Sequence, residues 1–413
     1  MNRLPNAGTA RTKSRGATSL IAFIALAAGV AIQNNYSLQP ALPAVAQTFG
    51  VPLSKMGLVA ASLQAGYMVG IVLLVPLGDR VAAARIVSCQ FALLAVALVL
   101  AACSPNVSAL AAAGCMIGML ATNAVHLASI AFKVADPLSR GRAVGTVGMG
   151  ISAGILLSRF VGGLVAQAAG WRTLLILSGA ACLVLAFVAQ RLLPKKAPSG
   201  AGSYLRLLGS LPSLLFRFAL LREGIAVGAC WFFVFSMLWI TLVLEVAGPP
   251  LNLSAAQAGM FSFAGILGLF ATRVAGRAAD RFGHRQVIAA SLVLVLAGVA
   301  LMMAAPASIA ALAVGLVVFD AGCFSAQVAN QTRVLAIDAD SRSRIYSVYM
   351  FIYYAAGALG SIAGPLILER FGWRFVCQLA LIVSAIGLAI TFACYCAHAK
   401  QRVPQNEPRP PVS

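Results

Sequence analysis

Long apolar segments separated by short polar loops fill the chain from residue 18 to residue 396. Each is long enough to cross the ~30 Å hydrocarbon core of a bilayer, which takes roughly 20 helical residues. Because backbone polar groups must be satisfied internally in lipid, the pattern predicts helices. The segments cover residues 18–40, 55–77, 86–103, 107–132, 143–168 and 172–192, then 222–246, 256–275, 286–304, 307–332, 343–368 and 374–396. We therefore expect an all-α membrane protein with twelve transmembrane helices in two sets of six.

The polar stretches divide the chain into five parts. A Pro- and Gly-containing stretch with Lys195 and Lys196 separates the two sets of helices and is typical of a linker, with a surface helix expected over residues 204–218. The predicted parts are a basic tail (1–17), an N-terminal six-helix bundle (18–192), the linker (193–221), a C-terminal six-helix bundle (222–396) and a second tail (397–413).

Short polar motifs occur twice in the chain, at offsets of 201 or 202 residues. The pairs are Asp79-Arg80 with Asp280-Arg281, Asp136 with Asp338, Ser139-Arg140-x-Arg142 with Ser341-Arg342-x-Arg344, and Gly170-Trp171-Arg172 with Gly372-Trp373-Arg374. An internal repeat in a membrane chain indicates two similar bundles related by a pseudo-symmetry axis. Transporters use this arrangement to place a substrate site near the bilayer midplane.

Composition and charge agree with a membrane protein. Hydrophobic residues make up 61% of the chain and charged residues 10%, so a water-soluble globule would expose a very large apolar surface. The net charge of +20 does not indicate nucleic acid, because most Lys and Arg residues lie in loops on one side of the predicted membrane. By the positive-inside rule, both termini are expected in the cytoplasm, in a plasma membrane such as the bacterial inner membrane.

Several function classes lack the residues that they need. The nine Cys residues lie mostly in the apolar segments, which argues against a disulfide framework, and Cys394-x-Cys396-x-His398 does not fit the common zinc spacings. The chain has no Gly-x-x-x-x-Gly-Lys-Ser/Thr motif for ATP and no cluster of catalytic side chains. We therefore expect no enzyme activity, no cofactor and no metal. One chain holds both bundles, so a monomer is expected.

The duplicated loop resembles a family signature. Its C-terminal copy fits Gly-x-x-x-Asp-Arg-x-Gly-x-Arg, and its N-terminal copy has Val75 and Ala82 in place of the glycines. The matching residues are Gly276, Asp280, Arg281, Gly283 and Arg285, and in the first copy Asp79, Arg80 and Arg85. The signature is similar to that of the major facilitator superfamily, over almost the whole chain. The resemblance implies a loop that latches the two bundles on the cytoplasmic side; the alternative is a loop that only anchors the helices at the headgroups.

Two charged residues lie deep inside the predicted spans, away from the span ends. Asp320 is about halfway along the tenth span, where a charge costs roughly 2.5–3.5 kcal/mol on insertion scales. The resemblance implies that the first, fourth, seventh and tenth helices line a central cavity, so Asp320 is the candidate proton-coupling residue; a static packing role is the alternative. Arg159 in the fifth span is expected at a similar depth and is the candidate partner of Asp320.

Polar and aromatic residues gather in the helices that are expected to line the cavity. Hydrogen-bonding groups suit the polar functions of a substrate and aromatic rings suit an apolar body, although single residues of this kind more often serve packing. The candidate cavity residues are Asn34, Asn35, Tyr36, Gln39, Asn123, His126, Trp231, Trp239, Gln327 and Asn330.

The function expected from these features is secondary active transport of a small organic compound by alternating access. The resemblance is nearest to the proton-linked efflux branch of the superfamily. Glycines Gly150, Gly154, Gly162 and Gly163 in the fifth span resemble its antiporter signature, but the usual Gly-Pro is missing there, so the direction stays open. The alternative is proton-coupled uptake of a small organic anion, with Arg159 as its counter-charge.

Overall fold

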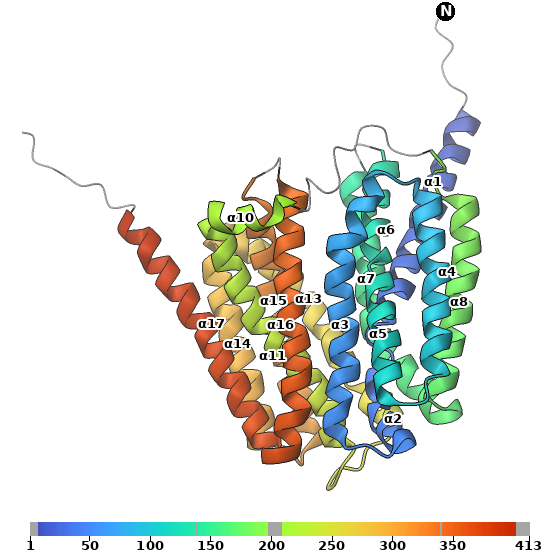
Figure 1. Ribbon diagram of the computed structural model, residues 1–413. Coiled ribbons are helices and arrows are strands. Elements are labelled where there is room, and N and C mark those ends of the chain that lie inside the picture. The colour runs from blue at the N-terminus through green and yellow to red at the C-terminus, as the bar shows by residue number, and fades with distance from the viewer. Residues whose placement is uncertain (1–6, 137–138, 197–208, 339–340, 402–413) are drawn as a thin grey trace, which may run out of the picture.

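The protein is built from helices (Figure 1). The computed structural model describes residues 7–136, 139–196, 209–338 and 341–401, and this part of the chain contains no β-strand. It holds 11 helices that are long and apolar enough to cross a membrane, together with a shorter apolar helix over Ser19–Gln33 that belongs to the first span. The expected fold of twelve transmembrane helices is confirmed.

The helices follow the order of the predicted spans. The N-terminal bundle contains α1 (Ala7–Gln33), α2 (Leu42–Phe49), α3 (Met56–Leu73), α4 (Ala83–Ala102), α5 (Val107–Ala121), α6 (Asn123–Val134), α7 (Arg140–Ala169) and α8 (Trp171–Leu192). Short 3-10 turns are η1 (Gln39–Ala41), η2 (Leu53–Lys55) and η3 (Val75–Asp79). Within the segment predicted as the linker lies α10 (Leu211–Arg217), inside the surface helix expected over residues 204–218, of which residues 204–208 fall outside the described residues. The C-terminal bundle contains α11 (Ala219–Val246), α12 (Ala255–Met260), α13 (Ser262–Phe282), α14 (His284–Ala304), α15 (Ile309–Leu335), α16 (Arg342–Phe371) and α17 (Trp373–Gln401).

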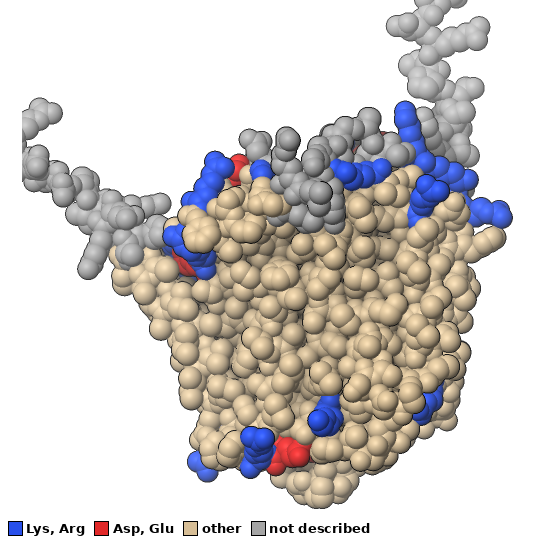
Figure 2. All heavy atoms as spheres, viewed as in Figure 1, with Lys and Arg blue, Asp and Glu red and all other residues tan. Residues whose placement is uncertain are grey.

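Helix α1 begins and α17 ends at the same face of the molecule, which we call the terminal face; the other end is the opposite face (Figure 1). Basic side chains gather mainly along the terminal face in Figure 2, and a broad uncharged band separates them from the charges at the opposite face. Many large apolar side chains in this band are exposed, for example Phe187 and Val184 at 62% each. Lipid is the solvent that accommodates such a band.

The first predicted span is not one continuous helix. Helix α1 starts at Ala7, within the predicted tail, and ends at Gln33, before the expected end at residue 40. Asn34 Nδ2 donates to the carbonyl of Val30 at 2.7 Å and so satisfies one acceptor at the helix end. Pro40 lacks an N–H donor, and the chain turns there into η1 and α2. The break places irregular backbone and polar side chains inside the protein within the first span, and discontinuous helices of this kind carry the substrate sites of many transporters.

The two bundles meet along α3 with α16 and along α7 with α12. Helices α3 and α16 stand side by side at the centre of Figure 1. Two glycines permit close approach near the opposite face: a Cβ at Gly57 would lie 2.7 Å from the carbonyl oxygen of Ser361, and Gly163 lies directly against the backbone of Ala255. Small residues let helices pack closely in lipid. The bundles are therefore closed against each other at the opposite face.

Candidate functional site

A buried polar site lies between the two bundles. Its N-terminal half consists of Arg159 on α7, Gln39 in η1 and Tyr36 in the turn before η1. Arg159 Nε donates to Gln39 Oε1 at 2.8 Å, and the guanidinium lies 5.0 Å from the centre of the Tyr36 ring. The break in the first span places Tyr36 and Gln39 at the depth of Arg159. The polar cluster that the sequence places in the first span thus forms one wall of this site.

The C-terminal half of the site consists of Trp239 on α11 and Asp320 on α15. The Trp239 Nε1–H donates to Asp320 Oδ1 at 3.1 Å. The guanidinium of Arg159 lies over the Trp239 ring, 3.9 Å from its centre, in a cation–π contact. One tryptophan therefore links the two buried charges across the boundary between the bundles.

Arg159 and Asp320 both contact Trp239, but they do not form a direct ion pair within the described part of the chain. Both are buried, with 2% and 0% of their surface exposed. Arg159 Nη2 and Asp320 Oδ2 have no hydrogen-bond partner. A buried polar atom without a partner is costly, so each of these two atoms has unused hydrogen-bonding capacity.

Aromatic rings surround this site on the C-terminal side. Phe232 stacks on Tyr353 with ring centres 3.8 Å apart, and Trp231 meets Tyr353 edge-on at 5.1 Å. The Trp231 Nε1 atom is buried without a hydrogen-bond partner. Tyr67 of the N-terminal bundle meets Tyr354 of the C-terminal bundle at 4.5 Å. The site therefore combines charges with apolar aromatic surface.

Hydrogen bonds close the site from the opposite face. Gln64 Nε2 on α3 donates to Ser236 Oγ and to Ser361 Oγ, each at 3.1 Å. At the opposite face itself, the Ser54 N–H donates to Glu369 Oε2 at 3.0 Å. These bonds join the two bundles, so the conformation is sealed on this side.

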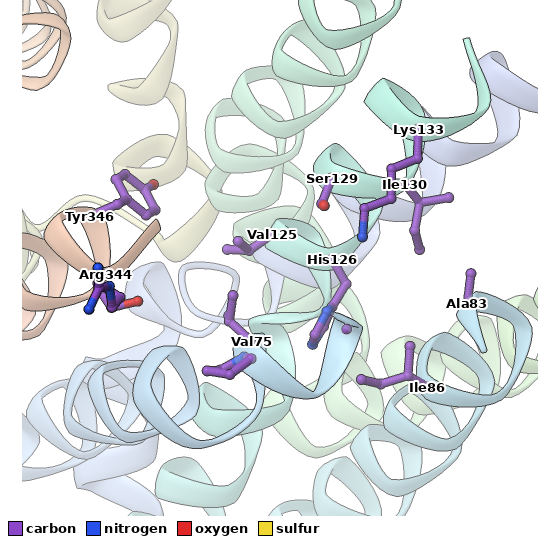
Figure 3. Close-up of a pocket in the computed structure, with 13 residues that line it drawn as sticks. Val75, Ala83, Ile86, Val125, His126, Ser129, Ile130, Lys133, Arg344 and Tyr346 are labelled. Carbon is purple, nitrogen blue, oxygen red and sulfur yellow. The ribbon is translucent and has the colours of Figure 1, made fainter. Parts of the chain in front are cut away.

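A pocket lies between the bundles near the terminal face (Figure 3). It has a volume of about 170 Å³ and is lined by η3, by α6 with His126 and Lys133, and by the start of α16 with Arg344 and Tyr346. His126 lies against Gly78 of η3, whose added Cβ would be 2.6 Å from its ring. We call this pocket the mouth; apolar and polar side chains both line it. Its charged side chains, Lys133 and Arg344, are both basic.

The C-terminal copy of the loop signature takes part in a charge cluster that the sequence analysis missed. Glu223 on α11 receives two bonds from Arg285, at 2.6 and 2.8 Å, and one from Arg333 at 2.6 Å. Arg333 also donates to Asn330 Oδ1, and Asn330 Nδ2 donates to the Gly224 carbonyl. Glu223 and Arg333 each lie at the edge of an apolar segment, and these charges are the sequence signal that could have indicated the cluster. Only the fold shows that three helices bring them together.

The other signature residues serve the loops. Gly283 ends α13 with φ of +98°, a left-handed conformation that favours glycine, and so permits the turn into α14. Arg281 lies over the ring of Phe282, 5.1 Å from its centre. Asp280 and Gly276 lie on α13 without a described contact to the N-terminal bundle. In the first copy Arg85 is exposed and Arg80 half-buried, while the side chain of Asp79 lies outside the described residues.

The remaining candidate cavity residues have separate surroundings. Asn34 and Asn35 are buried at the break in the first span, each with an unpartnered Oδ1 atom. Asn123 Nδ2 donates to the Val87 carbonyl at 3.1 Å within the N-terminal bundle. Gln327 is half-buried on α15. No group of three metal-ligating side chains occurs among the residues that the structure describes.

The close approach at Gly57 gives a first testable prediction. In Gly57→Ala the added Cβ meets the backbone of α16, so the bundles should separate at the opposite face and the protein should shift toward the alternative opening. Spin labels at positions 55 and 370 should show longer distances than in the parent chain. Gly179→Ala is the control, because its Cβ finds ordinary contacts within one bundle. Unchanged distances in Gly57→Ala would contradict the role of this contact.

Two six-helix bundles with a buried charged site between them define a membrane transporter. The chain belongs to the Major Facilitator Superfamily, whose family profile matches residues 24–336 and 238–412. The expected family is therefore confirmed, and the protein is a transporter rather than an enzyme.

Three known proteins illustrate the similarity. The chain is 31% identical over 372 residues to the putative uncharacterized transporter YgaY of Escherichia coli (strain K12), which covers 90% of this chain and 94% of YgaY. It is 25% identical over 271 residues to the multi-drug resistance efflux pump PmrA of Streptococcus pneumoniae, covering 62% of this chain and 63% of that protein. A bacterial homolog of the human lysosomal transporter Spinster, in an inward-facing and occupied conformation, shares the fold with a TM-score of 0.73, 15% identity and coverage of 93% and 98%.

Proposed function

We propose that the protein is a proton-coupled exporter of a small organic compound in the plasma membrane of a bacterium. In this proposal the terminal face is cytoplasmic, in line with the basic residues along it. The conformation is then open toward the cytoplasm and closed on the outside. Alternating access follows from rocking one bundle against the other about the buried site, and one chain is sufficient for this movement.

The observation that carries the proposal is the Arg159–Trp239–Asp320 arrangement across the bundle boundary. An ionised Asp320 partly balances the buried charge of Arg159, because electrostatic attraction is strong in a medium of low dielectric constant. Protonation of Asp320 removes this balance and leaves a buried cation, which is costly. Proton uptake therefore favours a conformation in which Arg159 finds water or a substrate anion.

Efflux is supported by the resemblance to a family member named as an efflux pump. The runner-up is uptake of a small organic anion, which the unpartnered Arg159 Nη2 atom favours as a counter-charge. The two functions use the same site and differ in the direction of net flux. Purified protein in proteoliposomes, tested on a compound panel with a pH gradient of either sign, separates them. Absence of any gradient-driven flux across the panel would contradict both.

The latch gives a second prediction. If the first loop holds the bundles together when the site faces outward, Asp79→Asn should slow transport severalfold while the protein still inserts in the membrane, because the loop loses the negative charge of its carboxylate. Initial flux rates in proteoliposomes at matched protein density measure the effect. The exposed Asp136→Asn is the control. Parent rates in Asp79→Asn would leave the loop with an anchoring role only.

A further inference from the structure

A groove runs between α7 and α13 on the flank of the molecule. It has a volume of about 510 Å³, within the range of small-molecule sites. Its walls include Gly145, Gly148, Met149 and Phe270, and Arg273 contributes a charge. We call it the lateral groove. It is separate from the mouth in Figure 3, which lies between η3, α6 and the start of α16.

The lateral groove exists because α7 leaves the C-terminal bundle on its way to the terminal face. Near the opposite face, Gly163 packs on the backbone of Ala255, and Gly259 packs on the backbone of Arg159. Toward the terminal face, a Cβ added at Gly145 or Gly148 would meet nothing within 4 Å. The helices therefore diverge, and the gap between them opens sideways into the apolar band of the surface.

The outer walls of the groove face lipid. Met149 is 59% exposed and Phe270 is 60% exposed, both at positions inside apolar spans. An apolar compound dissolved in the adjoining leaflet can reach these side chains without crossing water. Hydrocarbon chains are the natural occupants of such walls, because burying apolar groups there costs no polar desolvation.

The inner end of the groove reaches the charged site. Leu156 lines the groove, and its side chain lies beside Gly265 of α13. A Cβ at Gly265 would be 3.1 Å from Asp320 Oδ2, the carboxylate oxygen that has no hydrogen-bond partner. One leucine side chain therefore separates the groove from the buried charges. Leu156 is thus the side chain that both lines the groove and packs beside Gly265, next to Asp320.

Arg273 gives the groove a positive charge, which favours an anionic ligand. It lies on α13 nine residues before the helix end at Phe282, which places it roughly 13 Å along the axis from that end. It forms no ion pair with a carboxylate among the described residues. A guanidinium beside apolar walls matches a compound with an acidic head and an apolar body.

We propose that the lateral groove is the entrance through which an amphipathic organic anion passes from the membrane leaflet at the terminal face to the Arg159–Asp320 site. The acidic head is held by Arg273 and the apolar body by the walls of α7 and α13. This proposal rests on the proposed transport function and adds the substrate class and the route. The head is then transferred past Leu156 to Arg159, whose Nη2 atom has no partner.

Binding in the groove can be measured by fluorescence quenching with the full chain in lipid nanodiscs. The reporter is Phe270→Trp, and the probe is ω-bromoundecanoate, a carboxylate with a heavy-atom quencher at the end of its chain. Quenching beyond that of the native tryptophans should saturate. Gly148→Leu fills the groove and should lower the affinity for the probe by about tenfold, equivalent to about 1.4 kcal/mol. Gly141→Leu, on the same helix with equally open surroundings but outside the groove, should leave binding unchanged.

The charge preference is tested with matched variants and probes. Arg273→Gln should lower the affinity for ω-bromoundecanoate by about tenfold. Arg277→Gln, one turn further along α13 and outside the groove, should leave the affinity unchanged. A bromoalkyl trimethylammonium of equal length should not give saturable quenching. Equal quenching by the cationic probe, or unchanged binding in Gly148→Leu, overturns the proposal.

Flux of the same carboxylate in proteoliposomes separates the route from the function. Loss of pH-driven flux in both Asp320→Asn and Gly148→Leu supports both proposals. If pH-driven flux is lost in Asp320→Asn but kept in Gly148→Leu, the proposed transport function is supported and the lateral entrance is overturned. Saturable quenching that depends on Gly148 without any gradient-driven flux supports the groove as a binding site and overturns the proton-coupled transport.

Discussion

Replacement of Asp320 with asparagine should reduce pH-gradient-driven flux to the level of protein-free liposomes. The amide keeps the shape of the side chain and can accept the hydrogen bond from Trp239 Nε1, but it cannot take up or release a proton. Because Asp320 is completely buried and linked through Trp239 to Arg159, no other carboxylate at this site can replace it among the described residues.

The same variant should retain exchange of substrate across the membrane without a gradient. An amide resembles the protonated carboxyl group, so exchange should continue and lose its dependence on pH. Flux with an imposed gradient and counterflow without one are measured on the same vesicles. The exposed Asp136→Asn controls for the chemical change itself. Gradient-driven accumulation in Asp320→Asn at parent rates would show that the proton is carried elsewhere.

Replacement of Glu223 with glutamine should destabilise the C-terminal bundle by about 3–5 kcal/mol, the usual cost of removing one partner from a buried ion pair. Glu223 is the shared partner of Arg285 and Arg333, and its side chain is 5% exposed. Without its charge, two guanidinium groups face each other near the start of α11. The midpoint of unfolding of the purified protein in detergent measures the loss.

Two controls test the origin of that loss. Glu245→Gln lies near the other end of the same helix and has no ion pair among the described residues, so it should change stability by much less. Adding Arg333→Gln to Glu223→Gln removes the excess cation and should recover part of the stability. Equal destabilisation by Glu223→Gln and Glu245→Gln would mean that the cluster has no special role.

The sequence indicated the charged residues of the site but not their contacts. Asp320 and Arg159 are conspicuous because placing a charge in a membrane span costs free energy, and this cost does not depend on which neighbours the helix packs against. Trp239 was one of several aromatic residues in its span. Its position between the two charges depends on the rotation of α11 relative to α7 and α15, which hydrophobicity does not encode when a helix is apolar on all sides.

The loop signature shows the same difference. Its C-terminal copy resembles the family pattern closely, and the family is confirmed. The partner of Arg285 nevertheless proves to be Glu223 on another helix, at a distance in the sequence that no local motif specifies. The latch role of the first copy stays a prediction.

The sequence by itself determined the class of protein, the number of spans, the duplication and the rarity of charge within the spans. These follow from the solvent: lipid demands continuous apolar helices and penalises each buried charge, residue by residue. The tertiary structure alone decided how the helices rotate and approach each other, and so which bundle faces are sealed, that Trp239 joins the two charges, and that α7 and α13 diverge into a groove. Helix association in lipid depends on the close packing of small residues and on a few polar contacts between distant segments, and both exist only once the helices have been brought together.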